Sequence, residues 1–327
     1  MNGWPIIKLL PHKTNFQFVK YAKGFAIMSA ILTVAAIVGC FYPGLNLGID
    51  FRGGASMEVS KPAGQVLELD RLRGAVNGLS MGDVQVQGIA RRDTNANDGS
   101  TAIVRFQVPA NADQTEVVQK VEHAIDQAVG QVTYSGVSVV GSKVSGELLT
   151  NGVLALVIAV VLMFLYIAFR FPWQFGIGAV AGLLHDVALT FGLIVLLRME
   201  FSLNLVAALL TVIGYSMNDT VVVFDRLREN LRKYKVMPLR EVIDLSINET
   251  LSRTIITGVT TVIVLIVLAV FGGEALRGFS ITLAFGVVIG TFSSIYVGAP
   301  IILLWGVKRG GASVDAKPVK LGMASRP

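Results

Sequence analysis

Three ionisable residues inside long apolar segments are the first candidates for chemistry in this sequence. His185 and Asp186 lie together in the apolar segment 173–197, and Asp219 lies in the apolar segment 201–224. An ionisable side chain costs about 3 kcal/mol at the centre of a membrane helix, so such residues usually face protein and mark a path for ions or substrates. The chemistry that they indicate is reversible proton binding.

Asp219 has the clearest pattern, because Tyr215 and Ser216 lie one turn before it on the same helical face. The supporting polar residues are Tyr215, Ser216, Asn218, Thr220 and Thr257. Arg253 precedes the next apolar segment and shares a helical stripe with Thr257, Thr260 and Thr261, which brings an ion pair between Asp219 and Arg253 within reach. Asp219 is then either a carboxyl that exchanges a proton during turnover or a structural polar contact. A movable arginine partner would permit exchange, whereas a fixed ion pair would not.

His185 and Asp186 leave two interpretations open, a proton relay and a structural hydrogen-bonded pair. Asp186 follows Gly178 and Gly182 at four-residue spacing, a small-residue surface that lets another helix approach closely. We therefore expect Asp186 to point at protein. A second small-residue stripe predicts close helix packing and consists of Thr282, Gly286, Gly290, Ser294 and Gly298.

The composition requires a membrane to position these residues. The 327 residues are 53% hydrophobic and 15% charged, which is too apolar for an ordinary soluble enzyme. The net charge of +6 sits in short segments beside apolar runs, so it indicates contact with membrane lipid and orientation in the bilayer, and we expect no nucleic-acid partner. Cys40 is the only cysteine, which excludes an intrachain disulfide and a cysteine-based metal site; we expect neither metal nor cofactor.

Six segments are long and apolar enough to span a bilayer. They are 24–42, 148–169, 173–197, 201–224, 254–273 and 278–307. The first resembles a signal peptide, but its basic lead-in and the later spans favour an uncleaved anchor. Basic residues concentrate in 1–23, in the connection 225–253 and in the tail 308–327, which predicts that both termini are cytoplasmic. Residues Asp225 to Glu229 lie at the membrane edge and are expected to form a solvated helix end.

The segment 43–147 predicts a small extracytoplasmic α+β domain between the first two spans. Strands are expected at 55–60, 83–90, 101–108 and 132–140, and helices at 65–79 and 113–129. The order β-α-β-β-α-β is that of the ferredoxin-like split βαβ motif. We see no catalytic constellation in this domain, and His123 is expected to be a solvated surface residue.

Four motifs resemble those of a known family. They are Gly48-Ile49-Asp50-Phe51-Arg52-Gly53-Gly54 after the first span, the stretch 214–230 around Asp219, His185-Asp186-Val187, and Phe271-Gly272-Gly273. Together they are similar to the SecD/SecF family of the resistance-nodulation-division superfamily, with Gly48, Asp50, Phe51, Gly53 and Gly54 as its signature. The modest size of the domain favours the SecF branch over SecD.

This resemblance implies the fold, partners and coupling ion. The fold would be one six-span half of a resistance-nodulation-division bundle, with SecD as the other half of a heterodimer. The pair would be a transport component and no enzyme, using the proton motive force to help unfolded preproteins through the SecYEG channel of the bacterial inner membrane. YajC and YidC are further implied partners. In the family, residues that match Asp219 and Arg253 are associated with proton transport.

Three other functions remain as alternatives. The chain could be half of a small-molecule exporter of the same superfamily, although such exporters usually carry two six-span halves. It could be a passive scaffold in which Asp219 and Arg253 only hold helices together. A membrane-embedded hydrolase is disfavoured because the spans show neither a nucleophile with a convincing base nor an H-E-x-x-H zinc motif.

Overall fold

A computed structural model of the chain describes residues 14–62, 65–79, 84–89, 100–108 and 112–307. Its contacts divide the chain into two compact units. One unit contains the bundle segments Met1–Gly44, Val157–Leu197 and Ala207–Pro327, and the other contains Leu45–Leu156 and Arg198–Val206.

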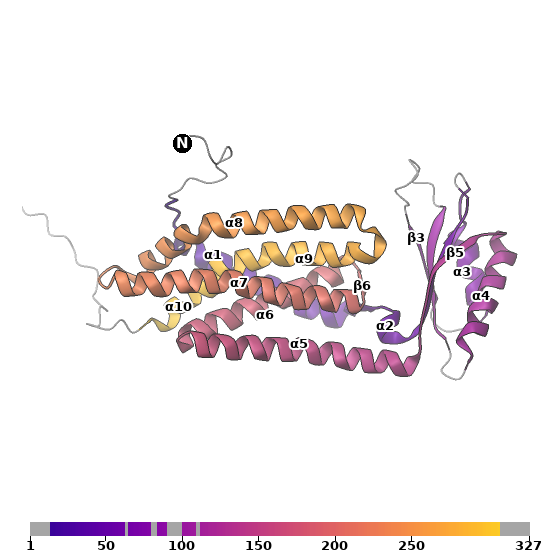
Figure 1. Ribbon diagram of the computed structural model, residues 1–327, viewed down its shortest axis with the longest axis horizontal. Coiled ribbons are helices and arrows are strands. Elements are labelled where there is room, and N and C mark those ends of the chain that lie inside the picture. Colours follow the sequence, from indigo (N-terminus) through magenta and orange to yellow (C-terminus); the bar gives the residue numbers. More distant parts are fainter. Residues whose placement is uncertain (1–13, 63–64, 80–83, 90–99, 109–111, 308–327) are drawn as a thin grey trace, which may run out of the picture. The chain divides into compact units, whose positions relative to one another are not determined.

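Six helical segments in the described part of the chain are long and apolar enough to cross a membrane, which confirms the predicted number of spans. They are α1 (Phe18–Gly39) with the π-helical turn η1 (Cys40–Gly44), α5 (Ser142–Arg170), α6 (Trp173–Leu196), α7 (Leu203–Lys233), α8 (Leu239–Phe271), and α9 (Gly273–Ser293) with η2 (Ser294–Gly298) and α10 (Ala299–Trp305). Figure 1 shows most of these helices running alongside one another.

Several helices extend beyond the apolar segments that predict them. The fourth and fifth are the largest cases, since α7 continues to Lys233 and α8 begins at Leu239. Polar contacts between the extensions explain the difference, because Arg226 pairs with Glu249 at 2.7 Å and Asn230 donates to Ser246 at 3.0 Å. Hydropathy reports only the apolar part of a helix, so it ends the span where these contacts begin.

Small residues bring the bundle helices into close contact. A methyl group added at Gly192 of α6 would lie 2.6 Å from the Cβ of Ala36 in α1, and one added at Gly290 of α9 would lie 3.0 Å from Ser216 in α7. A methyl group added at Gly178 of α6 would lie 2.5 Å from the backbone carbonyl oxygen of Gly298 in η2. Both small-residue stripes predicted from the sequence therefore pack against neighbouring helices.

The second unit contains the predicted α+β domain. Its strands are β2 (Gly54–Ser60), β3 (Val84–Ile89), β4 (Thr101–Phe106) and β5 (Thr133–Val140), and its helices are α3 (Leu69–Asn77) and α4 (Gln114–Val129). The antiparallel sheet has the order β3-β4-β2-β5, which is that of a ferredoxin-like domain. Figure 1 shows α3 and α4 on one face of this sheet.

Alternation along the strands builds the core of this domain. Ala55, Met57 and Val59 of β2 are fully buried at alternate positions, and they pack with Val121 and Ile125 of α4. The helix starts one residue later than predicted, because Asp113 is its N-cap and accepts hydrogen bonds from the N–H groups of the first turn. Helix α3 starts at Leu69 instead of residue 65.

A second, two-stranded sheet joins distant parts of the same unit. Strand β1 (Asn46–Leu47), just after the first span, pairs in parallel with β6 (Glu200–Phe201), the loop between α6 and α7. The short helix α2 (Ile49–Arg52) follows β1 directly. Both the family signature and the start of α7 are therefore positioned in this unit.

Candidate functional site

Asp186 is the centre of a buried hydrogen-bond network that joins three helices. Its side chain is 0% exposed, and its Oδ2 accepts hydrogen bonds from Ser216 of α7 at 2.5 Å and from Ser293 of α9 at 2.6 Å. The Nδ1 of His185 lies 2.9 Å from the other carboxylate oxygen, Oδ1. Three donors on two oxygens fit an ionised carboxylate.

The network continues through His185 to the first helix. The hydroxyl of Ser29 in α1 forms a short hydrogen bond with Nε2 of His185, and the His185 ring stacks on Phe292. When the imidazole is neutral, Ser29 donates to it; when it is protonated, Ser29 accepts. The pair of His185 and Asp186 can therefore take up a proton without losing its hydrogen bonds.

Ser29, His185 and Asp186 follow the order of a serine-hydrolase triad, so the sequence-based statement that the spans lack a nucleophile with a base is wrong. Ser29 is 3% exposed, and it does not line any of the pockets described below. The arrangement can hold or pass a proton.

Asp219 forms a second buried carboxyl site, on α7. Its Oδ1 accepts a hydrogen bond from Thr254 of α8 at 2.7 Å, and its Oδ2 lies 3.4 Å from the hydroxyl of Ser294 in η2. The hydrogen of Ser294 has a nearer acceptor, the carbonyl of Thr291 at 2.9 Å. The contact between Oδ2 and Ser294 is therefore a long one, and the side chain of Thr291 also interacts with the Asp219 carboxyl.

The ion pair suggested between Asp219 and Arg253 is not formed within the part of the chain that the structure describes. Arg253 lies on the exposed face of α8, whereas the next residue, Thr254, is buried and bonds Asp219. Successive helical residues point about 100° apart, so only one of the two can face α7. Thr257 and Thr260 lie on the same exposed face as Arg253.

Two adjacent serines connect the carboxyl sites, a link that the sequence reasoning missed. Ser293 bonds Asp186 and Ser294 bonds Asp219, and Ser216 lies one turn before Asp219 on α7. The π-helical turn η2 begins at Ser294, and such turns frequently occur at functional sites. The sequence analysis assigned Ser294 to a helix-packing stripe because of its small size, and so did not identify its hydroxyl as a hydrogen-bonding group.

The other supporting residues lie around Asp219 in different environments. Tyr215 is partly buried, and its hydroxyl lies 3.3 Å from that of Thr261 on α8. Thr220 is buried, whereas Asn218 and Thr257 are exposed. Ser216 and Tyr215, one helical turn before Asp219, therefore bond Asp186 and Thr261 rather than Asp219, and Asn218 and Thr257 lie on the outer surface of the chain.

The family signature residues form a junction between α2, β4 and the start of α7. The carboxylate of Asp50 accepts the backbone N–H of Leu203, the first residue of α7, at 2.9 Å, and the Phe51 ring packs 5.4 Å from that of Phe201. Asp50 thus satisfies one of the N–H groups that a helix leaves free at its start.

The glycines of the signature are required by sterics at this junction. A methyl group at Gly48 would lie 2.8 Å from the Glu200 carboxylate, which pairs with Arg105. Gly53 and Gly54 have φ angles of 74° and 136°, which favour glycine, and Gly54 also abuts the carbonyl of Phe106.

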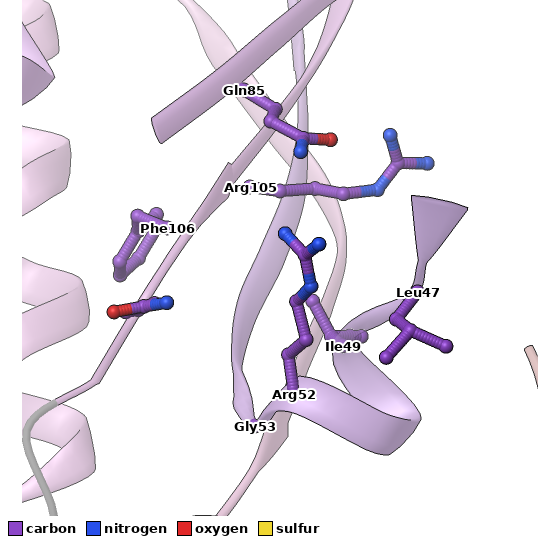
Figure 2. Close-up of a pocket in the computed structure, with 9 residues that line it drawn as sticks. Leu47, Ile49, Arg52, Gly53, Gln85, Arg105 and Phe106 are labelled. Carbon is purple, nitrogen blue, oxygen red and sulfur yellow. The ribbon is translucent and has the colours of Figure 1, made fainter. Parts of the chain in front are cut away.

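A pocket beside this junction is too small for a substrate. It is lined by Arg52, Arg105, Gln85 and neighbouring backbone, and Figure 2 shows the two arginine side chains entering it from α2 and β4. Its volume of about 30 Å³ corresponds to roughly one water molecule. No group of three metal-ligating side chains occurs among the described residues.

Comparison with known proteins identifies the family. Residues 120–308 match the family model described as protein export membrane protein SecD/SecF, C-terminal, and residues 43–60 match the SecD/SecF GG motif. The chain is 46% identical to the protein translocase subunit SecF of Cereibacter sphaeroides over 95% of its own length and 96% of the relative. It is 42% identical to the SecF subunit of Rhodobacter capsulatus over 94% of each chain.

A solved structure has the same architecture. The crystal structure of SecDF from Thermus thermophilus, described as a translocon-associated membrane protein, superposes with a TM-score of 0.80 at 31% identity. The match covers 91% of this chain but only 39% of that one, so the chain corresponds to about two fifths of the SecDF polypeptide. These similarities, with the six apolar helices and the α+β domain, show that the chain belongs to the SecF family of protein translocase subunits.

Proposed function

We propose that this chain is the proton-coupling half of a SecD–SecF pair that uses the proton motive force to assist unfolded preproteins through the SecYEG channel. The protons are the coupling ion, and no cofactor takes part. Family membership supports the role in protein export. The coupling itself rests on the buried carboxyl groups of the bundle.

The observation that carries this proposal is the environment of Asp219. The carboxyl is 6% exposed on a membrane-spanning helix, its hydrogen-bond partners are hydroxyl groups, and the charge of Arg253 acts on it from beyond ion-pair distance. Hydroxyl groups both donate and accept, so they can satisfy the charged and the neutral carboxyl alike. A carboxyl fixed in an ion pair would be held in one state.

The link to Asp186 suggests how a proton on Asp219 alters the bundle. Protonation of Oδ2 turns the contact with Ser294 from acceptor to donor, and Ser294 is bonded through the backbone to Ser293, which holds Asp186. His185 and Asp186 then have one of two roles. They relay the proton, or they are a structural pair that stays in place while α7 and η2 move.

The outer faces of α7 and α8 carry polar residues that a second helical subunit would cover. Thr211, Asn218, Arg253 and Thr257 are exposed on these helices, although polar side chains within spans usually face protein. A second six-span subunit such as SecD would cover them, and a carboxylate from that subunit would neutralise Arg253. SecYEG, YajC and YidC would associate with the assembled pair.

We further propose an orientation in the bacterial inner membrane with both termini in the cytoplasm and the α+β domain outside. The basic residues Arg226, Arg228, Arg232 and Lys233 at the end of α7 support it. A cysteine at Gln127, on the exposed side of α4, in a chain in which Cys40 is changed to serine, should react with a membrane-impermeant reagent in intact cells whose outer membrane is permeabilised. Labelling only after lysis of the inner membrane would contradict this orientation.

The proposal is tested by replacing Asp219 in the reconstituted SecD–SecF pair. Asp219→Asn keeps the size and hydrogen bonding of the side chain but removes the titration, so we expect normal assembly and loss of proton flux by at least tenfold. Asp219→Glu should retain part of the flux. Asp70→Asn, the same change at a 96% exposed carboxyl of α3, is the control and should leave flux near normal. Normal flux in Asp219→Asn would instead favour a passive scaffold.

A further inference from the structure

A groove at the end of α5 and α7 is lined mostly by charged side chains. Its volume is about 550 Å³, and its lining residues are Arg170, Asp225, Arg228, Glu229, Arg232 and Lys233. Four of these residues are cationic and two are anionic. The groove is far larger than the pocket beside the signature motif, so it can hold a polar headgroup rather than a single water molecule.

Both carboxylates of the groove are already neutralised. Asp225 accepts two hydrogen bonds from Arg170, at 2.8 and 3.0 Å. Glu229 pairs at 2.7 Å with Arg226, which does not line the groove and is itself shared with Glu249. The groove therefore has an excess of positive charge, because both of its carboxylates are paired and further cations line it.

Three cations of the groove form no salt bridge with any described residue. Arg228 makes one long contact, from its guanidinium to the carbonyl of Arg170 at 3.4 Å, and Lys233 lies over the ring of Tyr234. Arg232 and Lys233 are exposed. Arginine presents several N–H groups in a fixed fork that matches phosphate oxygens, and lysine adds a point charge. The free donors of this groove fit a phosphate group.

The surroundings favour a phosphate carried by a lipid over free phosphate. Phe169 and Trp173, which flank Arg170, are 91% and 58% exposed, as expected for aromatic residues at a membrane interface. Ile158, Leu162 and Leu165 form an exposed apolar stripe on α5 that ends at Phe169. An acyl chain can lie along this stripe while its headgroup occupies the groove.

We infer that this groove binds the headgroup of an anionic phospholipid, with Arg228, Arg232 and Lys233 contacting the phosphate. Basic clusters next to the polar end of a membrane helix attract anionic lipid by about 1 kcal/mol per residue. The Asp225 to Glu229 segment, expected from the sequence to be a solvated helix end, becomes part of this site. The site does not depend on proton coupling at Asp219.

The test is native mass spectrometry of the intact SecD–SecF pair titrated with dioleoyl phosphatidylglycerol or dioleoyl phosphatidylcholine. We expect the first phosphatidylglycerol to bind at least tenfold more tightly than phosphatidylcholine. The double variant Arg232→Gln/Lys233→Gln should abolish this preference. Lys235→Gln/Arg240→Gln, which removes the same charge outside the groove, is the matched control and should retain it.

Three results would overturn the inference. Equal losses in both double variants would mean a diffuse charge effect, and an unchanged preference in the groove variant would place the lipid elsewhere. Displacement of phosphatidylglycerol by inorganic phosphate at equal concentration would mean a free-anion site. The last result comes from Arg232→Cys in the lipid-free pair. If the SecD subunit protects this cysteine from a polar thiol reagent, the groove is a protein contact.

Discussion

The bond between Ser293 and Asp186 offers a quantitative test of the buried network. Both side chains are 0% exposed, and the hydroxyl lies 2.6 Å from the carboxylate oxygen. Hydrogen bonds to charged groups contribute about 1.5–3 kcal/mol in proteins, whereas couplings between membrane helices average about 0.6 kcal/mol and reach about 1.7. Because Ser216 and His185 also bond this carboxylate and can take over part of the stabilisation, we expect a coupling of about 1–2 kcal/mol.

The perturbation is a double-mutant cycle of Asp186→Ala, Ser293→Ala and the double variant. Asp186→Ala removes the acceptor of three buried donors, of which Ser293 keeps a second acceptor, the carbonyl of Gly290 at 3.1 Å; at about 1–3 kcal/mol for each of the other two, its cost should be about 2–5 kcal/mol after relaxation. In the double variant one of those donors is absent. The unfolding free energy lost in the double variant should therefore be smaller than the sum of the two single losses, and the difference is the coupling energy.

The assay is the free energy of unfolding of the reconstituted pair in mixed micelles with increasing denaturing detergent. Ser280→Ala is the matched control, because Ser280 is also fully buried but donates to the backbone carbonyl of Leu276. Its cost should add to that of Asp186→Ala within about 0.5 kcal/mol. If Ser293→Ala is equally additive, the hydroxyl does not stabilise Asp186, and the proposed link between the two carboxyl sites fails.

Two further predictions concern packing and the outer domain. Gly178→Ala should destabilise the bundle by about 1–3 kcal/mol in thermal unfolding, because its new methyl would lie 2.5 Å from a backbone carbonyl, whereas Gly176→Ala, with 3.9 Å of clearance, should be nearly neutral. Burial raises the pKa of the Tyr134 hydroxyl, which donates to Asp126, so the folded state favours the neutral phenol and loses this stabilisation as the pH rises past the ordinary tyrosine value near 10. Tyr134→Phe should therefore cost about 1 kcal/mol at pH 8 and less at pH 11, and an equal cost at both would contradict the assignment.

The spans and the α+β domain could be predicted because their signals are local. A membrane helix must satisfy its own backbone and present apolar side chains over its whole length, so its sequence alone identifies it. The alternation of Ala55, Met57 and Val59 likewise identifies β2 without knowledge of its partners. Helix ends were less accurate, because the end of α7 depends on contacts with α8 and not on hydropathy.

The hydrogen-bond partners of the two carboxyls could not be predicted in the same way. Ser29 is 156 residues from His185, and Ser293 is 107 residues from Asp186, so their contacts depend on how the helices pack. A serine in an apolar helix also resembles a packing residue. Arg253 is the opposite case, a charged residue that the sequence suggests as a partner of Asp219 but that does not pair with it. The orientation of α8 directs Thr254, and not Arg253, toward Asp219.

The two carboxyls differ in what their partners allow, and this difference suggests a division of labour. Asp186 receives three well-formed hydrogen bonds from three different residues, so a change in its charge would disturb α6, α7 and α9 together. Asp219 receives one short bond, from Thr254, and one long contact, from Ser294, and it also interacts with the Thr291 side chain and with the charge of Arg253. On the proposed mechanism, proton exchange takes place at Asp219. Since Ser293 and Ser294 are consecutive, the proposed mechanism predicts that a shift of η2 on protonation of Asp219 would also move the hydroxyl that holds Asp186.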